Sequence, residues 1–399
     1  PSCAIAMLEN GAYRVWSHSQ GIHPLRKDLS KALKVPEDAV RVTHVEGAGC
    51  YGHNGADDVA CDAALLARAV PGHPVRVQWM REDEFGWEPF GSAMVVKMRA
   101  GLDASGNIVS WSHDLWSHAH STRPPGKDGV NLLGAWHLAD PLTAATPGNL
   151  PLPAGGSHRN ALPLYDLPGQ KITNHLVRRS SLRASALRSL GAHANVFAIE
   201  SFIDEIAAAT GRDSMELRLA LLKDARAKAV IETVAEKSGW RPNEKGDGVR
   251  GRGVAFARYK NLGSYVAVVA EVELGDTLRV TRVWSAVDVG QVINPDGVIN
   301  QIEGGIIQAT SWTLKEAVRY DRRSVLSRTW ADYPILTFSE VPRVEVELLN
   351  RPELPPLGAG EGAQGPTSAA IANAVFNATG IRLRDMPFTR ERLVSAMTA

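Results

Sequence analysis

A glycine-rich turn near the end of the chain holds a single carboxylate, Glu361. Residues 357–370 read LGAGEGAQGPTSAA, and an apolar helix follows through Ile371 and Val375. Glycine lets the backbone approach a ligand closely and adopt positive φ. A helix start also offers unpaired N–H groups and the positive end of a dipole. An acid held in such a turn could serve as a base directed at a bound substrate.

Two other interpretations of this turn need weighing. Residues 360–367 have the glycine spacing of a phosphate-binding P-loop, but Pro366 stands where that motif has its lysine. The motif also carries an acid where phosphates would lie, so we reject a P-loop. An ordinary turn with a solvated Glu361 remains open on these residues alone.

A second glycine cluster, residues 47–52, reads GAGCYG between an expected strand at 40–45 and an expected helix at 57–69. This is formally the dinucleotide-binding spacing. Asp57 and Asp58 open the helix, however, and would repel a pyrophosphate at its N-terminus. A flavin- or nicotinamide-binding loop and a simple strand-to-helix turn both stay open as alternatives.

Two polar residues outside these turns are candidates for a site. Gln20 follows the first hairpin, and its amide can both donate and accept hydrogen bonds. Arg188 lies in the turn ALRSLG at residues 186–191, where a fixed cation could stabilise negative charge developing on a substrate. The alternatives are a turn residue for Gln20 and an exposed surface arginine for Arg188.

Three histidines near one another invite comparison with a transition-metal site. They are His113, His118 and His120, with Asp114 beside them. Alternation along a strand would put His118 and His120 on one face and His113 on the other. We therefore expect these side chains to be structural.

Several blocks of the chain, in one order from end to end, resemble the molybdenum-binding subunit of the xanthine dehydrogenase / aldehyde oxidase family of molybdenum hydroxylases. Within the family they are most similar to the bacterial branch of nicotinate dehydrogenase and isoquinoline oxidoreductase large subunits. The blocks are GCYGHNGADD at 49–58, LRSLG at 187–191, FAIESFIDE at 197–205, FARYKN at 256–261, AVDVG at 286–290 with INP at 293–295, QIEGGIIQ at 301–308, and the Glu361 turn.

The resemblance implies an α+β fold and oxidative hydroxylation with a molybdopterin cofactor, in the cytosine dinucleotide form, with oxygen drawn from water. It gives Glu361 the role of base, Gln20 a hydrogen bond to a metal-bound oxo group, and Arg188 the stabilisation of charge. No protein side chain is expected to ligate the metal directly. The resemblance assigns the cofactor-binding positions to Gly49, Tyr51, Gly52, Gly191, Gly360 and Gly362.

The net charge and the cysteines of the chain limit the kinds of partner that it can have. A net charge of +1 argues against binding to nucleic acid. Cysteines 3, 50 and 61 form no C-x-x-C pair, so we expect no iron–sulfur cluster in this chain. Electrons would then leave through another polypeptide, a 2Fe–2S subunit and, by analogy with the branch, a c-type cytochrome.

The substrate stays open among N-heteroaromatic acids, other azaarenes and aldehydes. A non-catalytic chain that forms only half of a cofactor-binding site remains an alternative function.

The start of the chain reads PSCAIAM, like the inside of a strand. Resemblance implies an upstream segment with a Gly-Gln-Gly loop, so we expect a truncated or separately encoded part of a larger subunit. We divide the chain into a first cofactor-binding segment at 1–165 and a second at 166–399, which carries the Glu361 turn. The sequence shows no signal peptide and no transmembrane run.

Strand and helix patterns alternate without a βαβ rhythm, which favours an α+β fold. Asn10-Gly11 predicts a hairpin between strands at 3–9 and 12–17. We expect the Pro- and Gly-rich residues 121–170 to wrap over the surface of the protein. Further expected elements are a helix opening at Pro24, a strand at 75–79, a hairpin of 94–100 with 108–116, three helices within 196–240, strands at 264–274, 278–287 and 344–349, and a helix at 297–318.

Overall fold

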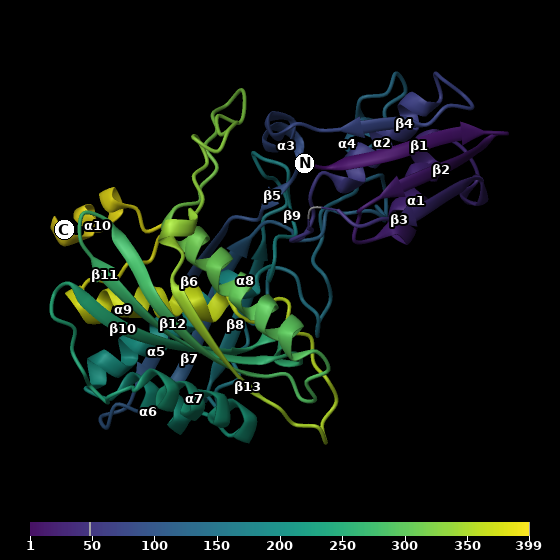
Figure 1. Cartoon of the computed structure of the whole chain (residues 1–399). Helices are drawn as coiled ribbons and strands as arrows, with labels where there is room; N and C mark the ends of the chain where they lie inside the picture. Colours follow the sequence, from purple (N-terminus) through teal and green to yellow (C-terminus); the bar gives the residue numbers. More distant parts are fainter. Residues whose placement is uncertain (48, 399) are drawn as a thin grey trace.

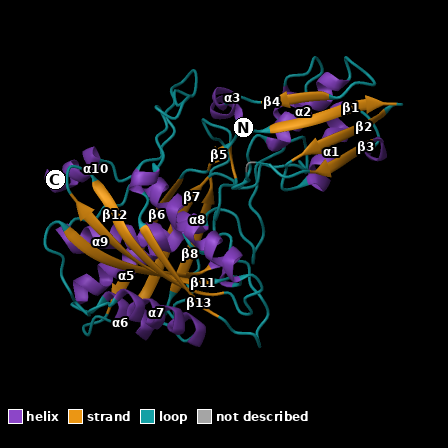
Figure 2. Cartoon of the chain, in the orientation of Figure 1, coloured by secondary structure: helices purple, strands orange, loops and turns teal. Residues whose placement is uncertain are grey.

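The computed structural model describes residues 1–47 and 49–398. Ala48, in the first glycine loop, and Ala399 lie outside the described residues. Helices and strands mix in an α+β arrangement, as the sequence predicts. Figures 1 and 2 show a smaller part built around the first strands and a larger part that holds the remaining sheets and most helices.

The smaller part is a four-stranded sheet in the order β3-β2-β1-β4. The predicted hairpin is confirmed, because Asn10 and Gly11 both take positive φ, 52° and 79°, between β1 and β2. Its helices bury their apolar side chains against the sheet. The elements are β1 (Cys3–Glu9), β2 (Ala12–Ser17), α1 (Ile22–Leu33), β3 (Val40–His44), α2 (Ala56–Ala67) and β4 (Val75–Gln78).

Residues 130–142 of the segment expected to wrap over the surface pack on this smaller part, whereas Tyr165 and Leu167 join the core of the larger part. Leu132 is fully buried in the same core as β1 and α2, and Leu133 packs against that core. The indole of Trp136 donates to the carbonyl of Val130 at 2.6 Å. The segment holds one short helix, α4 (Leu133–Trp136), and is otherwise irregular through residue 169.

The larger part contains a four-stranded sheet in the order β10-β11-β12-β13. Strand β10 was not expected, because its start alternates arginine with glycine. The glycines allow a helix to pack closely on the strand, because a Cβ on Gly253 would lie 2.2 Å from the backbone nitrogen of Ala374 in that helix. The strands are β10 (Arg250–Arg258), β11 (Tyr265–Leu274), β12 (Leu278–Asp288) and β13 (Arg343–Leu349), and the helix is α9 (Gln364–Thr379).

A three-stranded sheet in the order β6-β7-β8 completes the larger part. The hairpin of β6 (Met94–Leu102) and β7 (Ile108–Ser117) is as predicted, whereas β8 (Gln170–Leu176) was not expected. Trp111 of β7 shares its core with Ile203, Val230 and Trp284, which come from elements much later in the chain. The hairpin of residues 94–117 therefore packs with the second half of the chain.

Helices occupy the space around these sheets. The three predicted within 196–240 are confirmed, and the predicted helix at 297–318 begins slightly earlier at Pro295, capped by Asn294. Among the described residues, no helix combines the length and apolar character needed to cross a membrane. The remaining elements are α3 (Arg81–Trp87), β5 (Phe90–Gly91), β9 (Ala184–Ser185), α5 (Ala192–Thr210), α6 (Ser214–Leu221), α7 (Ala225–Ser238), α8 (Pro295–Leu314) and α10 (Arg390–Thr398).

Candidate active site

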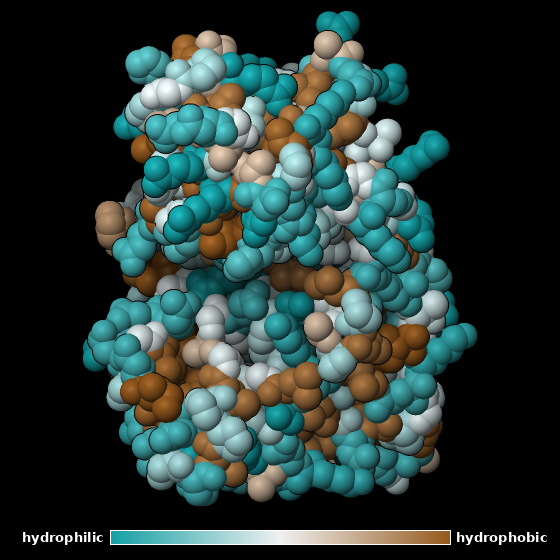
Figure 3. Space-filling model, turned by 90° about the vertical axis from the view of Figure 1, so that its right-hand side faces the viewer, coloured by the Kyte–Doolittle hydropathy of each residue, from teal (hydrophilic) through white to brown (hydrophobic). Residues whose placement is uncertain are grey.

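Three turns that are far apart in the sequence meet around one cavity of about 860 Å³. They are the glycine loop at 49–52, the arginine turn at 186–190 and the Glu361 turn at 360–361. The space-filling view in Figure 3 shows the surface hollowed between the two parts of the molecule. The side chains and loops predicted from sequence as a site are thus brought to one place.

The glycine loop is joined to the arginine turn through backbone. The amide of Arg188 donates to the carbonyl of Tyr51 at 2.7 Å, and the amide of His53 donates to Ala186 at 2.8 Å. Gly52 has a φ of 127°, and a Cβ there would lie 2.2 Å from the carbonyl oxygen of Ala186. Only glycine lets the two segments come this close.

Arg188 is fixed by oxygen acceptors from two elements. Its Nε donates to the carbonyl of Gly360 at 2.6 Å, and its Nη2 donates to the carbonyl and side-chain oxygen of Gln301 at 2.9 and 3.1 Å. Burial lowers the pKa of Arg188, while the negative charge of Glu361 opposes that shift. The result is an immobile cation beside the Glu361 turn.

Glu361 lies half-buried in the cavity wall, at the start of α9. The amide of Ser189 donates to its Oε1 at 2.9 Å, and the Ser189 hydroxyl donates to its backbone carbonyl at 2.6 Å. The hydroxyl of Tyr259 lies near the carboxylate, and burial raises the pKa of this phenol while the charge of Glu361 raises it further. The phenol therefore stays protonated beside Glu361.

Arg159 hydrogen-bonds the hydroxyl of Tyr259. Its Nη1 donates to the Tyr259 hydroxyl oxygen, while its Nε and Nη2 donate to the carbonyls of Ala154 and Gly155 at 2.8 and 2.9 Å. Because the hydroxyl oxygen accepts from Arg159, its hydrogen is free to point toward Glu361. Arg159 thus holds the Tyr259 hydroxyl in place beside the carboxylate.

Gln20 lies on the opposite wall, in an exposed position. Its amide nitrogen donates to the carbonyl of Cys50 at 2.9 Å, and its oxygen accepts from Arg123 at 2.6 Å. The carboxyl of Asp57 lies beneath, 3.9 Å from Arg123 and bonded to the Ser19 hydroxyl. Burial raises the pKa of Asp57 to about 6.

Asp57 and Asp58 stand at the start of α2, where we expected them to repel a pyrophosphate. Asp57 and Asp58 are both buried and face protein donors, not an open helix end where a phosphate would dock. The two carboxylates therefore serve as hydrogen-bond acceptors inside the protein, and they do not face a ligand at the helix end.

The predicted cofactor-binding residues fall into two groups. Gly49, Gly52 and Gly360 line the cavity, and so does Tyr51, whose side chain is 53% exposed. Gly191 and Gly362 are not among its lining residues. A Cβ on Gly191 would lie 2.1 Å from the Ser157 carbonyl, and one on Gly362 would lie 2.5 Å from the Ser264 hydroxyl, so close packing accounts for both.

Sequence reasoning missed two basic side chains that line the cavity, Arg123 and Arg159. Both come from the wrapping region, where no periodic pattern marks a face. His120, which we expected to be structural, also lines the cavity. The available signal was a basic residue directly before Pro124-Pro125, in a segment already expected to cover the protein.

The histidines lie close to hydrogen-bonding groups of the protein. Nε2 of His113 lies 3.1 Å from the Asn195 side-chain oxygen, and Nε2 of His120 lies 3.0 Å from the Ser117 hydroxyl. Burial lowers the pKa of each to about 4. The expected sharing of a face by His118 and His120 is wrong, because the strand ends at Ser117. Among described residues, no group of three or more His, Cys, Asp or Glu could hold a metal.

The cavity has the features that a bulky anionic cofactor requires. Gly49 and Gly52, with φ of 102° and 127°, let backbone approach a ligand without a side chain in between. Three guanidinium groups, from Arg123, Arg159 and Arg188, line the same space and favour phosphate or another anion. The residues present thus fit a molybdopterin group.

Comparisons with known proteins agree with this geometry. Residues 1–139 and 179–342 each match the molybdopterin cofactor-binding domain. The chain is 41% identical over 415 residues to a nicotinate dehydrogenase subunit of Pseudomonas putida, covering 100% of this chain and 33% of that protein. It is 33% identical to the beta subunit of isoquinoline 1-oxidoreductase of Brevundimonas diminuta, covering 85% of this chain and 41% of that protein.

A solved structure supports the fold. Quinoline 2-oxidoreductase from Pseudomonas putida 86 superposes with a TM-score of 0.79 at 16% identity, over 100% of this chain and 74% of that one. The chain spans between a third and a half of the length of the two curated relatives. With two cofactor-domain matches over most of its length, the chain belongs to the molybdopterin cofactor-binding subunits of the xanthine dehydrogenase family.

Proposed function

We propose that this chain supplies the catalytic cavity of a molybdenum-dependent dehydrogenase that hydroxylates an N-heteroaromatic compound or an aldehyde, with water as the source of oxygen. The observation that carries the proposal is Glu361, a carboxylate held by Ser189 in the wall of a cavity that also contains Arg188. The names of the relatives, nicotinate dehydrogenase and isoquinoline 1-oxidoreductase, support a heteroaromatic substrate.

The residues that would hold the cofactor are those of the two glycine turns. Gly49, Tyr51 and Gly52 offer backbone on one side of the cavity, and Gly360 offers it on the other. Gly191 and Gly362 would act indirectly, by letting the arginine and Glu361 turns pack. When bound, a molybdopterin group, which we propose to be the cytosine dinucleotide, supplies two-electron redox chemistry.

Within this site Glu361 would accept the proton that water gives up as its oxygen is transferred to the substrate. Arg188, fixed by Gly360 and Gln301, would stabilise negative charge that develops on the substrate. Gln20 would keep its amide oriented through Cys50 and Arg123, ready to hydrogen-bond an oxygen of the cofactor.

Electrons would leave through partner polypeptides. The three cysteines are free and separate in the structure. We propose a 2Fe–2S subunit and a c-type cytochrome as the electron acceptors. Purifying the assembled complex and recording its electron paramagnetic resonance and haem absorption tests this; a complex active with an artificial acceptor but without iron–sulfur or haem signals would contradict it.

Glu361→Gln tests the function of the site. The amide keeps the shape of the side chain and can still accept from Ser189, but it cannot take a proton. General-base catalysis contributes roughly 10²–10⁴ in rate, so kcat in the assembled complex should fall by that order. Molybdenum content, measured by elemental analysis, should stay at the wild-type level.

Glu353→Gln is the matched control, because Glu353 is exposed in the same C-terminal region. It should turn over at the wild-type rate. A Glu361→Gln complex with full molybdenum and near-normal turnover would remove Glu361 from the reaction.

A further inference from the structure

Asp57 is a buried carboxylate near the cavity that has no part in the proposed function so far. It stands in the first turn of α2 and is 3% exposed. It does not line the cavity of Glu361, whereas Gln20 and Arg123 do. A buried charge is costly unless it is paired and hydrogen-bonded, so the groups around this carboxylate show what it holds in place.

One oxygen of Asp57 fixes the backbone on both sides of Gln20. The hydroxyl of Ser19, the residue before Gln20, donates to Oδ1 of Asp57. The oxygen of the same hydroxyl accepts from the amide of Gly21, the residue after Gln20, at 3.0 Å. The backbone that carries Gln20 is therefore tied to the start of α2.

Arg123 connects the same carboxylate with the side chain of Gln20. Nη2 of Arg123 lies 3.9 Å from Oδ2 of Asp57, and Nη1 donates to the side-chain oxygen of Gln20 at 2.6 Å. The backbone carbonyl of Arg123 accepts from the side-chain amide of Asn131 at 3.0 Å, which fixes this part of the irregular segment. The guanidinium thus lies between a buried anion and the amide oxygen.

The other charged groups near Asp57 leave Arg123 as its counter-ion. Arg183 binds the neighbouring Asp58 at 2.6 and 3.1 Å. Nε2 of His53 lies 3.5 Å from Asp57, but burial lowers the pKa of His53 well below its usual value, so the ring is neutral. Burial raises the pKa of Asp57 to about 6, so most of the carboxyl group is ionised at pH 7 and can balance the guanidinium.

These contacts allow one orientation of the Gln20 amide. A guanidinium only donates hydrogen bonds, and a backbone carbonyl only accepts them. The amide oxygen must therefore face Arg123, and the amide nitrogen must face the carbonyl of Cys50, to which it donates at 2.9 Å. The nitrogen carries a second hydrogen, and no group of the described residues accepts it, so it is available to a ligand in the cavity.

We propose that Asp57 and Arg123 are positioning residues, which hold Gln20 as a hydrogen-bond donor toward the bound cofactor. This inference rests on the proposed function and adds to it the two residues that decide which end of the amide faces the cavity. Without Arg123 the amide can rotate and present its oxygen, which would repel an oxygen of the cofactor.

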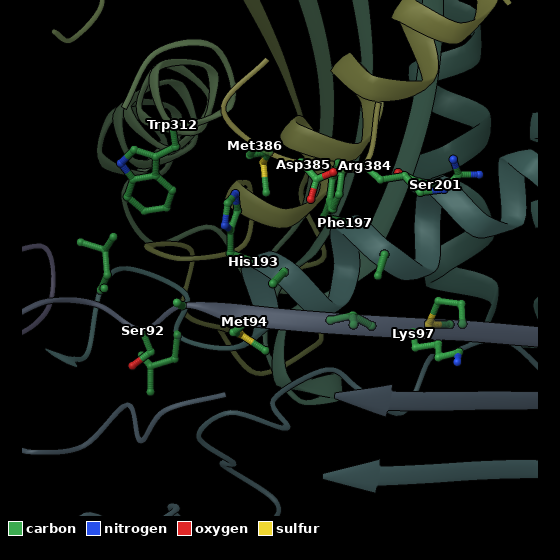
Figure 4. A pocket seen from close by; sticks show the side chains of 18 of the residues that line it. Ser92, Met94, Lys97, His193, Phe197, Ser201, Trp312, Arg384, Asp385 and Met386 are labelled. Atoms are coloured by element: carbon green, nitrogen blue, oxygen red, sulfur yellow. The ribbon is translucent and has the colours of Figure 1, made fainter. Parts of the chain in front are cut away.

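The Asp57–Arg123 pair is separate from a second cavity, of about 700 Å³, that adjoins the first. Figure 4 shows Trp312 facing this second cavity. Arg188 lines both cavities, but neither Gln20 nor Arg123 lines the second one. A small molecule that reaches Arg188 from the second cavity does not touch the pair. Loss of the pair should therefore lower kcat and leave KM nearly unchanged.

Substitutions in the assembled complex test the two residues. Arg123→Met removes the donor to Gln20, and Asp57→Asn removes the charge but can still accept from Ser19. Loss of a residue that orients a group at a metal costs about 10–100-fold in activity, so kcat should fall by about tenfold or more in each variant. Molybdenum content should stay at the wild-type level. Arg123→Lys keeps a cationic donor and should retain most of kcat.

Electron paramagnetic resonance of molybdenum(V) after reduction with dithionite reports on the cofactor without substrate. Arg123→Met and Asp57→Asn should both shift this signal, because outer hydrogen bonds tune a metal site. In complexes that also carry Gln20→Ala, neither substitution should shift the signal further, because both act through Gln20. An unshifted signal in Arg123→Met, or a shift of the same size with and without Gln20, would overturn the proposal.

Asp62→Asn is the matched control for Asp57→Asn. Asp62 lies on the same helix and accepts from the indole of Trp79 at 2.9 Å, but it lines neither cavity. Its kcat and its molybdenum signal should equal those of the wild type. A loss as large as that in Asp57→Asn would show that removal of any carboxylate from α2 disturbs the site, against a specific role of Asp57.

The molybdenum signal and the result for Glu361→Gln are independent of each other. A Glu361→Gln complex with normal turnover refutes the proposed function, while a shift in Arg123→Met that depends on Gln20 still supports the Asp57–Arg123 pair. A lower kcat in Glu361→Gln, together with an unshifted signal in Arg123→Met, overturns the role of the pair and leaves the proposed function standing.

Discussion

At the scale of single residues, Glu361 matters because its surroundings leave it one orientation. Ser189 donates to one carboxylate oxygen and to the backbone carbonyl of Glu361, and the hydroxyl of Tyr259 lies beside the carboxylate. Arg159 holds the tyrosine hydroxyl in turn. A base positioned in this way needs little reorganisation when it takes a proton.

Tyr259→Phe isolates the contribution of that hydroxyl. It removes the hydroxyl that lies beside the carboxylate and that Arg159 holds in place, so kcat/KM of the assembled complex should fall. The fall should be smaller than in Glu361→Gln, since the base itself remains. Steady-state rates of the assembled complex provide the measurement.

Tyr333→Phe is a closely matched control for this prediction. Tyr333 is half-buried and donates to a carboxylate, that of Glu316 at 3.0 Å, but it does not line the cavity that holds Glu361. Its kcat/KM should equal that of the wild type. Equal losses in the two variants would show that removal of any such phenol, and not support of Glu361, lowers activity.

Sequence reasoning reached some of these residues and not others. Glu361 and Arg188 stand in short blocks of glycine and small residues whose local pattern indicates a turn at a ligand. Arg159 and Tyr259 are 100 positions apart, and only folding brings them together. Arg159 lies in irregular chain, where no 2.0 or 3.6 period shows which side chains point inward.

At the scale of elements, local chemistry predicted most of the fold. Asn10-Gly11 sets the first hairpin, and the helices of residues 192–238 follow from their apolar spacing. Strand β10 was missed because Gly251 and Gly253 lower strand propensity. These glycines are required by α9, which lies more than 100 residues away in the sequence. Because α9 packs directly on β10, it would collide with any Cβ at these two positions.

The contact between the glycine loop and the arginine turn depends on a glycine in the same way. In Gly52→Ala the new Cβ would collide with the Ala186 carbonyl, and alanine also disfavours a φ of 127°. The loop should therefore separate from Arg188. Molybdenum content of the complex should fall several-fold, with a lower melting temperature of the protein.

Gly72→Ala separates the two effects. Gly72 also has a positive φ, 82°, but a Cβ there meets nothing within 4 Å. This control carries the backbone cost of roughly 1–2 kcal/mol without the collision. Molybdenum content in Gly72→Ala should stay at the wild-type level; a loss equal to that in Gly52→Ala would refute the role of the close approach.

At the scale of the whole molecule, the cavity exists only where the smaller and larger parts meet. Asp58, at the start of α2, is fully buried and accepts from Arg183 at 2.6 and 3.1 Å. It also accepts from the amide of Leu133 at 2.8 Å, in the wrapping segment. The sequence did not reveal this pairing, because the partners are 125 positions apart.

Arg183→Met should loosen the junction, because it leaves the Asp58 charge buried without its cation. Breaking a buried pair in this way costs about 3–5 kcal/mol, and a double variant, Arg183→Met with Asp58→Asn, should recover part of that loss. Thermal unfolding followed by circular dichroism measures both. Arg241→Met is the control, since Arg241 and Glu244 form an exposed pair at 3.6 Å and its loss should change the melting temperature very little. If Arg183→Met melts like Arg241→Met, Asp58 and Arg183 do not hold the two parts together, and the cavity must be maintained by the backbone contacts between the glycine loop and the arginine turn.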